Sequence, residues 1–433
     1  ARLLGHACVL CYTESTILLC DPWLKDTHLD GLVRRFPDPG PLDFTIPKPS
    51  ALLFSHHHWD HIHIPTLLEM DRDIPVYYPE NPRMTQIFDR LGFVNQFVIE
   101  HWQPFSVGNI KIWPTASHVP FGECGFYLES EGHGLLNLVD SVFKLEDILK
   151  LNQIADGRIR VCLVPYQSYD EMGILLGKPN SLNRHALCVE NARVITHLDC
   201  ELIIPAADGL YYPGNQFMNQ LGFFSTPFDF IDCLYEENFQ KKAMIGMPLD
   251  ELILHQPKVQ VKRTLPLSIE DILSLYEESR SFVEGVQLPD LDQTTPVEDS
   301  IKGVWSAIFD EYFLCGLDRF PKEYLEEFQR LGARFDLIVL PDFNGYQFDF
   351  IQGTVKILQP MEPGNAQLRI RAEDLMWLLE SKTLVNILMQ SDRMRLSGDT
   401  TELAYRALDM LAANGLLDED RISDYIGSYE AMA

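Results

Sequence analysis

The chain has 433 residues, of which 46% are hydrophobic and 11% aromatic; this excludes a disordered protein and is enough apolar material for one large domain or two smaller ones. Acidic residues outnumber basic residues by 63 to 35, and the net charge of −28 argues against a protein that binds nucleic acid through its phosphates. The nine cysteines show no regular spacing and no apolar run approaches the ~18 residues of a membrane span, so we expect a soluble, cytoplasmic protein without a membrane span.

Short strands alternate with helices along the first half of the chain. The apolar runs 7–12 and 16–20 flank a polar turn and predict a β-hairpin, in which Cys8, Cys11 and Cys20 are expected to be small core residues. Strands interleaved with helices predict an α/β layered domain. The further strands are expected at 51–54, 74–78, 110–113, 126–129, 135–139, 161–165 and 201–205, and the helices near 82–91, 144–151 and 182–199.

The second half of the chain has a different pattern. A mostly helical stretch is interrupted by an acidic, proline-bearing segment at 288–299. After it the sequence predicts strands at 337–340, 347–351, 355–358 and 367–370, followed by helices near 372–380 and 400–413. We therefore expect three regions: an α/β domain over 1–265, a mostly helical connecting region over 266–334, and a smaller α+β domain over 335–433.

One segment, residues 55–61, holds four histidines and one aspartate. Read as His56-x-His58-x-Asp60-His61, it offers nitrogen and oxygen donors to one or two divalent metal ions. It follows the apolar run 51–54 and precedes a helix expected from Pro65, which puts the donors on a loop at the end of a buried strand. These flanks disfavour the alternative, an accidental histidine cluster on a solvated loop. His57, Trp59 and His63 are assigned no chemistry.

Two later residues also follow apolar strands. His118 is a candidate third ligand for a metal ion held by His56 and His58, and Asp140 could bridge two ions. The alternatives are a hydrogen-bonded core histidine for His118 and a helix N-cap for Asp140.

His6 and Asp21 lie at strand ends near the inferred cleft. Metal-binding histidines and carboxylates need hydrogen-bond partners that fix their orientation. We expect His6 and Asp21 to orient the ligands in this way.

This donor set resembles the metallo-β-lactamase fold superfamily. More narrowly, roughly residues 3–215 are similar to the metallo-β-lactamase-like part of CMP-N-acetylneuraminate hydroxylase. The resemblance implies a four-layer αββα sandwich with one or two metal ions at one edge of the sheets. His56, His58 and His118 would hold the first ion, Asp60 and His61 the second, and Asp140 would lie between them. The segments that carry the narrower resemblance are Gly5-His6-Ala7-Cys8, Asp21-Pro22-Trp23-Leu24, Ile64-Pro65-Thr66-Leu67, Asp73-Ile74-Pro75-Val76-Tyr77 and Ile204-Pro205-Ala206-Ala207-Asp208-Gly209.

The sequence departs from the resemblance at two points. The superfamily usually supplies a further histidine after the final strand, where this chain has Tyr211-Tyr212-Pro213-Gly214. Asp208 is the favoured replacement as a ligand of the second ion, and His185 and His197 are the alternatives. The hydroxylase also relies on a Rieske cluster, whereas this chain has no pair of Cys-x-His and Cys-x-x-His segments.

The segments 368–375 and 394–399 resemble sterol-carrier-protein-type domains, over roughly residues 340–415. That resemblance implies an apolar tunnel and a substrate with an alkyl chain. The alternative is an accessory or dimerisation domain with an ordinary core.

Three functions stay open at this point. In a hydrolase, the metal ion would make hydroxide from water at neutral pH, and Asp60 or Asp140 would act as the catalytic carboxylate that orients the nucleophile or takes its proton. In a non-haem, di-iron oxygenase, electrons would come from a separate reductase, since histidine and carboxylate ligands suit iron as well as zinc or manganese. A non-catalytic scaffold is disfavoured by the intact motif. We favour a hydrolase of a small-molecule substrate, and we leave the choice between monomer and homo-oligomer open.

Overall fold

The structure is a computed structural model and describes residues 1–25, 27–28, 32–38, 46–119, 121–166, 184–207, 209–213, 218–219, 225–265, 267–280, 297–319, 322–358, 366–379, 388, 393–398, 426–427 and 430. Asp208, the side chain of His185 and the helix expected near 400–413 lie outside these residues. The chain divides into two compact units, the first from 1–169 and 183–282, the second from 170–182 and 283–433.

The first unit contains a sheet that is antiparallel at one end and parallel at the other. The predicted N-terminal hairpin is confirmed, because β2 and β3 pair antiparallel. From β3 onward the strands β6, β7 and β8 add in parallel, so their carboxyl ends lie at one edge. The strand order is β18 (Gln260–Lys262), β17 (Glu251–Ile253), β1 (Arg2–Gly5), β2 (Cys8–Tyr12), β3 (Ile17–Cys20), β6 (Ala51–Leu53), β7 (Val76–Pro79) and β8 (Gln96–Ile99).

A second sheet of the first unit repeats this plan. Its strands β12, β13, β14 and β16 are parallel, and β9, β10 and β11 are antiparallel. The strand order is β16 (Lys242–Ala243), β14 (Cys200–Ala206), β13 (Ile159–Pro165), β12 (His133–Asn137), β11 (Phe126–Ser130), β10 (Ile110–Pro114) and β9 (Phe105–Val107). A small third sheet is formed by β15 (Leu210–Tyr211), β5 (Val33–Arg35) and β4 (Thr27–His28).

The two large sheets pack face to face, and the two-residue repeat of the strands explains how. In β13, Val161 and Leu163 belong to the apolar core between the sheets, whereas Cys162 and Val164 belong to a second core on the opposite face. Successive side chains of a strand point to opposite faces, so an unbroken apolar strand is buried on both.

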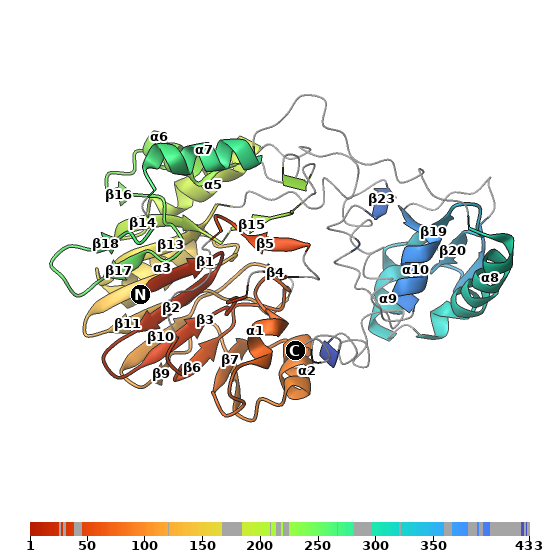
Figure 1. The fold of residues 1–433 in the computed structure, drawn as a ribbon, viewed down its shortest axis with the longest axis horizontal. Coiled ribbons are helices and arrows are strands. Elements are labelled where there is room, and N and C mark those ends of the chain that lie inside the picture. Colours follow the sequence, from red (N-terminus) through yellow and green to blue (C-terminus); the bar gives the residue numbers. More distant parts are fainter. Residues whose placement is uncertain are drawn as a thin grey trace. The chain divides into compact units, whose positions relative to one another are not determined.

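Helices cover the outer faces of both sheets (Figure 1). The second sheet packs against α3 (Leu145–Ala155), α5 (Arg184–Ile195) and α6 (Pro227–Glu236). On the first sheet, Phe88 of α2 (Pro82–Leu91) lies with its ring centroid 4.7 Å from that of Phe54 and 5.0 Å from that of Tyr78. The order helix, sheet, sheet, helix is the predicted αββα sandwich of the metallo-β-lactamase fold.

Two further helices in the described part of the first unit are α1 (Ile64–Leu68) and α7 (Ile269–Arg280). Ile272 and Tyr276 of α7 pack with Ile245 and Met247 in a small core cluster. None of the helices that the structure describes is both long and apolar enough to cross a membrane.

The second unit is a smaller α+β domain with its own core. The buried rings of Phe309, Phe313 and Phe328, from its helices, pack with those of Phe335 and Phe348 from its sheet. The sheet order is β21 (Thr354–Ile357), β20 (Tyr346–Asp349), β19 (Arg334–Leu340), β22 (Ala366–Arg371) and β23 (Met394–Gly398), and the helices are α8 (Asp299–Leu314), α9 (Lys322–Arg330) and α10 (Ala372–Leu379), with a 3₁₀ turn at Gly316–Arg319.

Candidate metal centre

The candidate site lies where strands of both large sheets end. Asp21 follows β3, and His56 follows the neighbouring parallel strand β6, so both reach the same edge of the first sheet. Asp140 follows β12 of the second sheet, after Val139, whose backbone φ is 53°. A left-handed residue such as Val139 turns the chain sharply, and such strained backbone positions cluster at functional sites.

The first donor group consists of His56, His61 and Asp140, whose ligand atoms all lie within 4.8 Å of one another. Asp140 Oδ2 is 3.0 Å from His61 Nε2 and 3.9 Å from His56 Nε2. His58 faces the same point, since its Nδ1 lies 2.9 Å from His56 Nε2. Four of the predicted ligands therefore converge.

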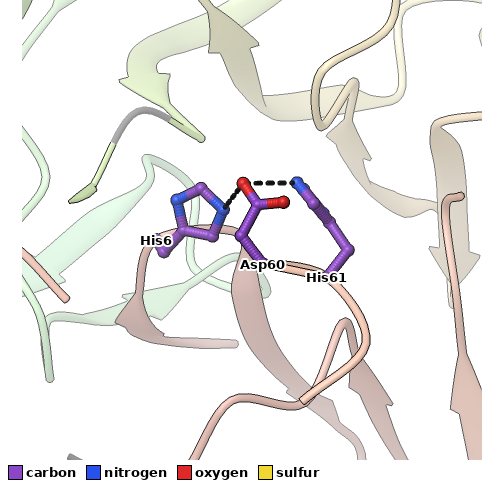
Figure 2. Close-up of side chains that lie close together, drawn as sticks. All are labelled: His6, Asp60 and His61. Atoms are coloured by element: carbon purple, nitrogen blue, oxygen red, sulfur yellow. Dashed lines mark ion pairs between the residues drawn. The ribbon is translucent and has the colours of Figure 1, made fainter. Parts of the chain in front are cut away.

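The second donor group consists of His6, Asp60 and His61. Figure 2 shows the carboxylate of Asp60 between the two imidazole rings, with Oδ2 3.3 Å from His6 Nε2 and 3.6 Å from His61 Nε2. His61 belongs to both groups. The two groups therefore form one continuous set of nitrogen and oxygen donors.

Asp21 lies behind this set of donors, and its role in orienting them stays a prediction that its contacts support. Its two carboxylate oxygens accept hydrogen bonds from the Ser55 backbone N–H at 2.8 Å and the Ser55 hydroxyl at 2.7 Å. Oδ2 also lies 3.0 Å from His61 Nδ1, so the other ring nitrogen of His61, Nε2, faces Asp140. A carboxylate on the far nitrogen fixes the ring orientation of a metal-binding histidine and raises its basicity.

The electrostatics of the site suit a cation. Burial lowers the pKa of His56 well below its usual value and also lowers the pKa of His58, which favours the neutral imidazoles that metals bind. Burial also lowers the pKa of His61, but the carboxylates of Asp140 and Asp60 outweigh it and raise that pKa well above the usual value. Burial raises the pKa of Asp60, yet His61 and His6 hold it well below its usual value. The carboxylates of Asp60 and Asp140 therefore favour a positive charge at this point, which a bound metal ion would supply.

Glu123 is a group that the sequence reasoning missed. Its side chain is 3% exposed, and Oε2 lies 3.9 Å from His56 Nδ1 while Oε1 accepts a hydrogen bond from Ser117 Oγ at 2.5 Å. Burial raises its pKa to about 7. The signal in the sequence was an acidic residue directly before the apolar Cys124 and the strand β11, where a charge is unusual.

His118 lies outside both donor groups. Its Nε2 is 2.7 Å from Asp147 Oδ2, and its backbone N–H donates to Val142 O at 2.8 Å. Its assignment as a third ligand stays a prediction. Asp140 is not a helix N-cap, because α3 begins at Leu145 with Lys144 as its cap residue.

The remaining candidate ligands lie near β14 in the sequence and are His185, His197 and Asp208. His197 is exposed, in the turn after α5, and belongs to neither donor group. His185 and Asp208 stay predictions. A cavity of about 50 Å³ lies beside His6, and its wall includes Asn137, Tyr166, Ala207 and Tyr276.

The sequence of residues 16–209 matches the family model described as a beta-lactamase superfamily domain. Residues 16–209 therefore form a beta-lactamase superfamily domain. The match includes His56, His58, Asp60, His61 and Asp140, and β1 and His6 precede it. No curated protein matches the sequence.

Solved structures that resemble parts of the chain include three that differ in their described functions. CmlA, described as a diiron β-hydroxylase from Streptomyces venezuelae, is 18% identical with a TM-score of 0.43, covering 61% of this chain and 53% of its own. This chain thus spans about half the length of CmlA. A chain from Veillonella parvula, described as a possible metal-dependent hydrolase, is 13% identical with a TM-score of 0.41, covering 57% of this chain and 96% of its own. Sterol carrier protein 2 from Yarrowia lipolytica is 17% identical with a TM-score of 0.21, covering 27% of this chain and 94% of its own.

Proposed function

We propose that the beta-lactamase superfamily domain is a metal-dependent enzyme that hydrolyses a small-molecule substrate. The observation that carries the proposal is the unequal burial of the donors. The imidazoles of His56 and His61 are fully buried, whereas the carboxylates of Asp60 and Asp140 are 25% and 32% exposed. Structural metal sites are closed by protein ligands, and catalytic sites keep an open position for water and substrate.

The residues have separable tasks in this proposal. His56, His58, His61 and Asp140 would hold one or two metal ions, which, when bound, lower the pKa of water and polarise the scissile bond of the substrate. Asp60 is held ionised by its two histidine neighbours, so its carboxylate can accept a hydrogen bond from the attacking water and orient it. Asp21 and Ser55 hold the ring of His61 in the orientation in which Nε2 faces the metal site.

A second candidate, an iron-dependent oxygenase with an external electron donor, is favoured by Glu123. A third carboxylate, buried 3.9 Å from a ring nitrogen of His56, makes the surroundings of the site richer in oxygen donors. Hard oxygen ligands favour iron or manganese over zinc. In this candidate Glu123 would become a ligand, and a separate reductase would supply the electrons.

Elemental analysis of the full chain purified without added metal, with an anaerobic optical spectrum before and after exposure to oxygen, separates the two candidates. For the hydrolase we expect zinc or manganese, a spectrum that oxygen does not change, and activity in ester, phosphodiester or sulfate-ester screens. Near-stoichiometric iron with an oxygen-sensitive absorption band would contradict the hydrolase and support the oxygenase.

The variant His58→Ala tests the site itself. Removing one of its imidazoles should lower the bound metal to half or less of the wild-type content per chain, because ligand loss weakens an open site strongly. His255→Ala, at an exposed position, is the control and should leave the metal content unchanged. Equal metal content in His58→Ala and the wild type would overturn the assignment of the site.

A further inference from the structure

His6 is placed at the site by an unusual turn. It lies between β1 and β2, where Gly5 has a backbone φ of 106° and His6 itself a φ of 47°. Such left-handed positions are rare for residues with a side chain, although histidine tolerates them better than most. The turn brings the His6 ring to 5.0 Å from that of His61 and 5.7 Å from that of Trp23, between centroids.

The ring of His6 is buried but its polar atoms are not hydrogen-bonded. The side chain is 2% exposed, and neither ring nitrogen makes a hydrogen bond to any residue that the structure describes. Buried ring nitrogens nearly always have a partner. The carboxylate of Asp60 lies 3.3 Å from Nε2 without the geometry of a hydrogen bond.

The spacing of the three donors fits a shared metal ion. Nitrogen and oxygen ligands lie about 2.0–2.2 Å from zinc in a tetrahedron, so two ligands of one ion are about 3.3–3.6 Å apart. Asp60 Oδ2 is 3.3 Å from His6 Nε2 and 3.6 Å from His61 Nε2 (Figure 2). These distances are longer than most direct hydrogen bonds and match two edges of a coordination polyhedron.

We propose that His6 is a metal ligand that, together with Asp60 and His61, holds a second metal ion, rather than a group that only orients other ligands. The proposal rests on the proposed function, since it assumes that the neighbouring His56, His58 and Asp140 hold the first ion and leave Nε2 of His61 to the second. The β1–β2 turn thereby becomes part of the metal centre, although it lies before the segment that matches the family model.

The test counts metal ions in the full chain after removal of metal with a chelator and titration with Co²⁺ alone. Asparagine tolerates a left-handed backbone, so His6→Asn removes the imidazole without changing the turn. His63→Asn is the matched control: His63 is also buried and its ring stacks on Trp23 at 5.6 Å, but it caps α1, a task that asparagine performs equally well.

For the wild type and His63→Asn we expect two equivalents of Co²⁺ per chain and the absorption bands of two sites. His6→Asn should keep one equivalent and bind the second at least tenfold more weakly, with loss of part of the visible absorption. Two equivalents of wild-type affinity in His6→Asn would overturn the proposal and leave the proposed function intact. Binding of one equivalent by the wild type would also overturn it, whereas no binding by the wild type would overturn the proposed function as well.

Circular dichroism and a thermal melt show whether His6→Asn folds. If it does not, His6→Gly is the second variant, because glycine adopts positive φ freely. Loss of the second equivalent in His6→Gly, with its return on adding free imidazole, would support His6 as a ligand. Retention of the second equivalent without imidazole would contradict it.

Discussion

At the scale of single residues, the sequence indicated the donors of one short motif and those that follow apolar strands, such as Asp140, but it missed Glu123. One short motif contains His56, His58, Asp60 and His61. Four possible ligands so close together can be recognised from the sequence alone. Asp21 was recognised because it ends an apolar strand. Glu123 escaped because its contact with His56 spans 67 positions of the chain, and no spacing rule relates the two. His118 shows the converse: its position after a strand did not indicate the contact with Asp147.

The carboxylate of Asp21 provides the first prediction. Asp21→Asn keeps the size of the side chain but loses the charge beside His61 Nδ1 and one of the two acceptors for Ser55. Loss of such an orienting group costs roughly 10- to 100-fold in metal affinity. Competitive metal titration against a chromophoric chelator measures this. Asp73→Asn, an exposed aspartate paired with Lys48, is the control, and equal affinity in both variants would refute the role of Asp21.

At the scale of elements, helices and central strands were predictable and edge strands were not. Residues 82–91 form α2 as predicted, because Asn81 caps its first turn, proline starts it and Gly92 ends it in a left-handed conformation. The strands β8, β9 and β17 were missed. They are short and lie at or near sheet edges, and none of them has more than three consecutive apolar residues, which is too short a run to predict a strand.

Gly125 provides the prediction at this scale. It precedes β11, and a methyl group there would lie 2.7 Å from Asn137 O and 2.9 Å from Leu138 Cα, in the segment that leads to Asp140. Because these are backbone atoms, Gly125→Ala must shift the turn, and we expect a loss of about 1–3 kcal/mol together with weaker metal binding. The free energy of opening of the β11 amides, from hydrogen exchange, measures the loss.

Gly303→Ala is the matched control, since Gly303 lies in α8 with no atom within 4 Å of the added methyl group. An alanine in an exposed helix position should stabilise α8 by about 0.5–1 kcal/mol. The two substitutions are chemically identical and should have opposite signs. A stabilising Gly125→Ala would contradict the packing described for the end of β12.

At the scale of the whole molecule, composition and alternation of elements were enough to predict the layered fold, because a sandwich with helices on both sides is the simplest way to bury apolar strands on both faces. The division of the chain was harder. Only contacts distant in sequence place α7 with the first unit: Ile272 and Tyr276 pack with Ile245 and Met247.

The molecule is acidic, with a net charge of −28, and a buried carboxyl group in such a molecule can make its stability depend on pH. Burial raises the pKa of Asp374 in α10 from 3.8 to about 6, and Arg393, whose Nη2 is 2.6 Å from Oδ1, only partly offsets it. The folded state therefore binds the proton more tightly than the unfolded state. Its contribution to stability is complete below pH ~4 and is lost as the pH rises through ~6, by about 3 kcal/mol in total.

Asp374→Asn should remove this dependence. From pH 4 to pH 7 the free energy of opening of the α10 amides should fall in the wild type, and this fall should be smaller by about 3 kcal/mol in the variant. Hydrogen exchange at the two pH values measures the difference. Glu311→Gln, at an exposed position in α8, should behave as the wild type, and a parallel pH response in Asp374→Asn would show that this carboxyl group is not the cause.

The cysteines have a practical consequence. All nine have free thiols; eight are buried, and burial raises the pKa of Cys8 and of Cys200 to about 12, which suppresses the reactive thiolate. Cys315, which follows α8 in the second unit, is exposed. A maleimide dye or spin label applied to the native chain would therefore attach at one defined position, outside the unit that carries the candidate metal centre, without any cysteine having to be engineered away.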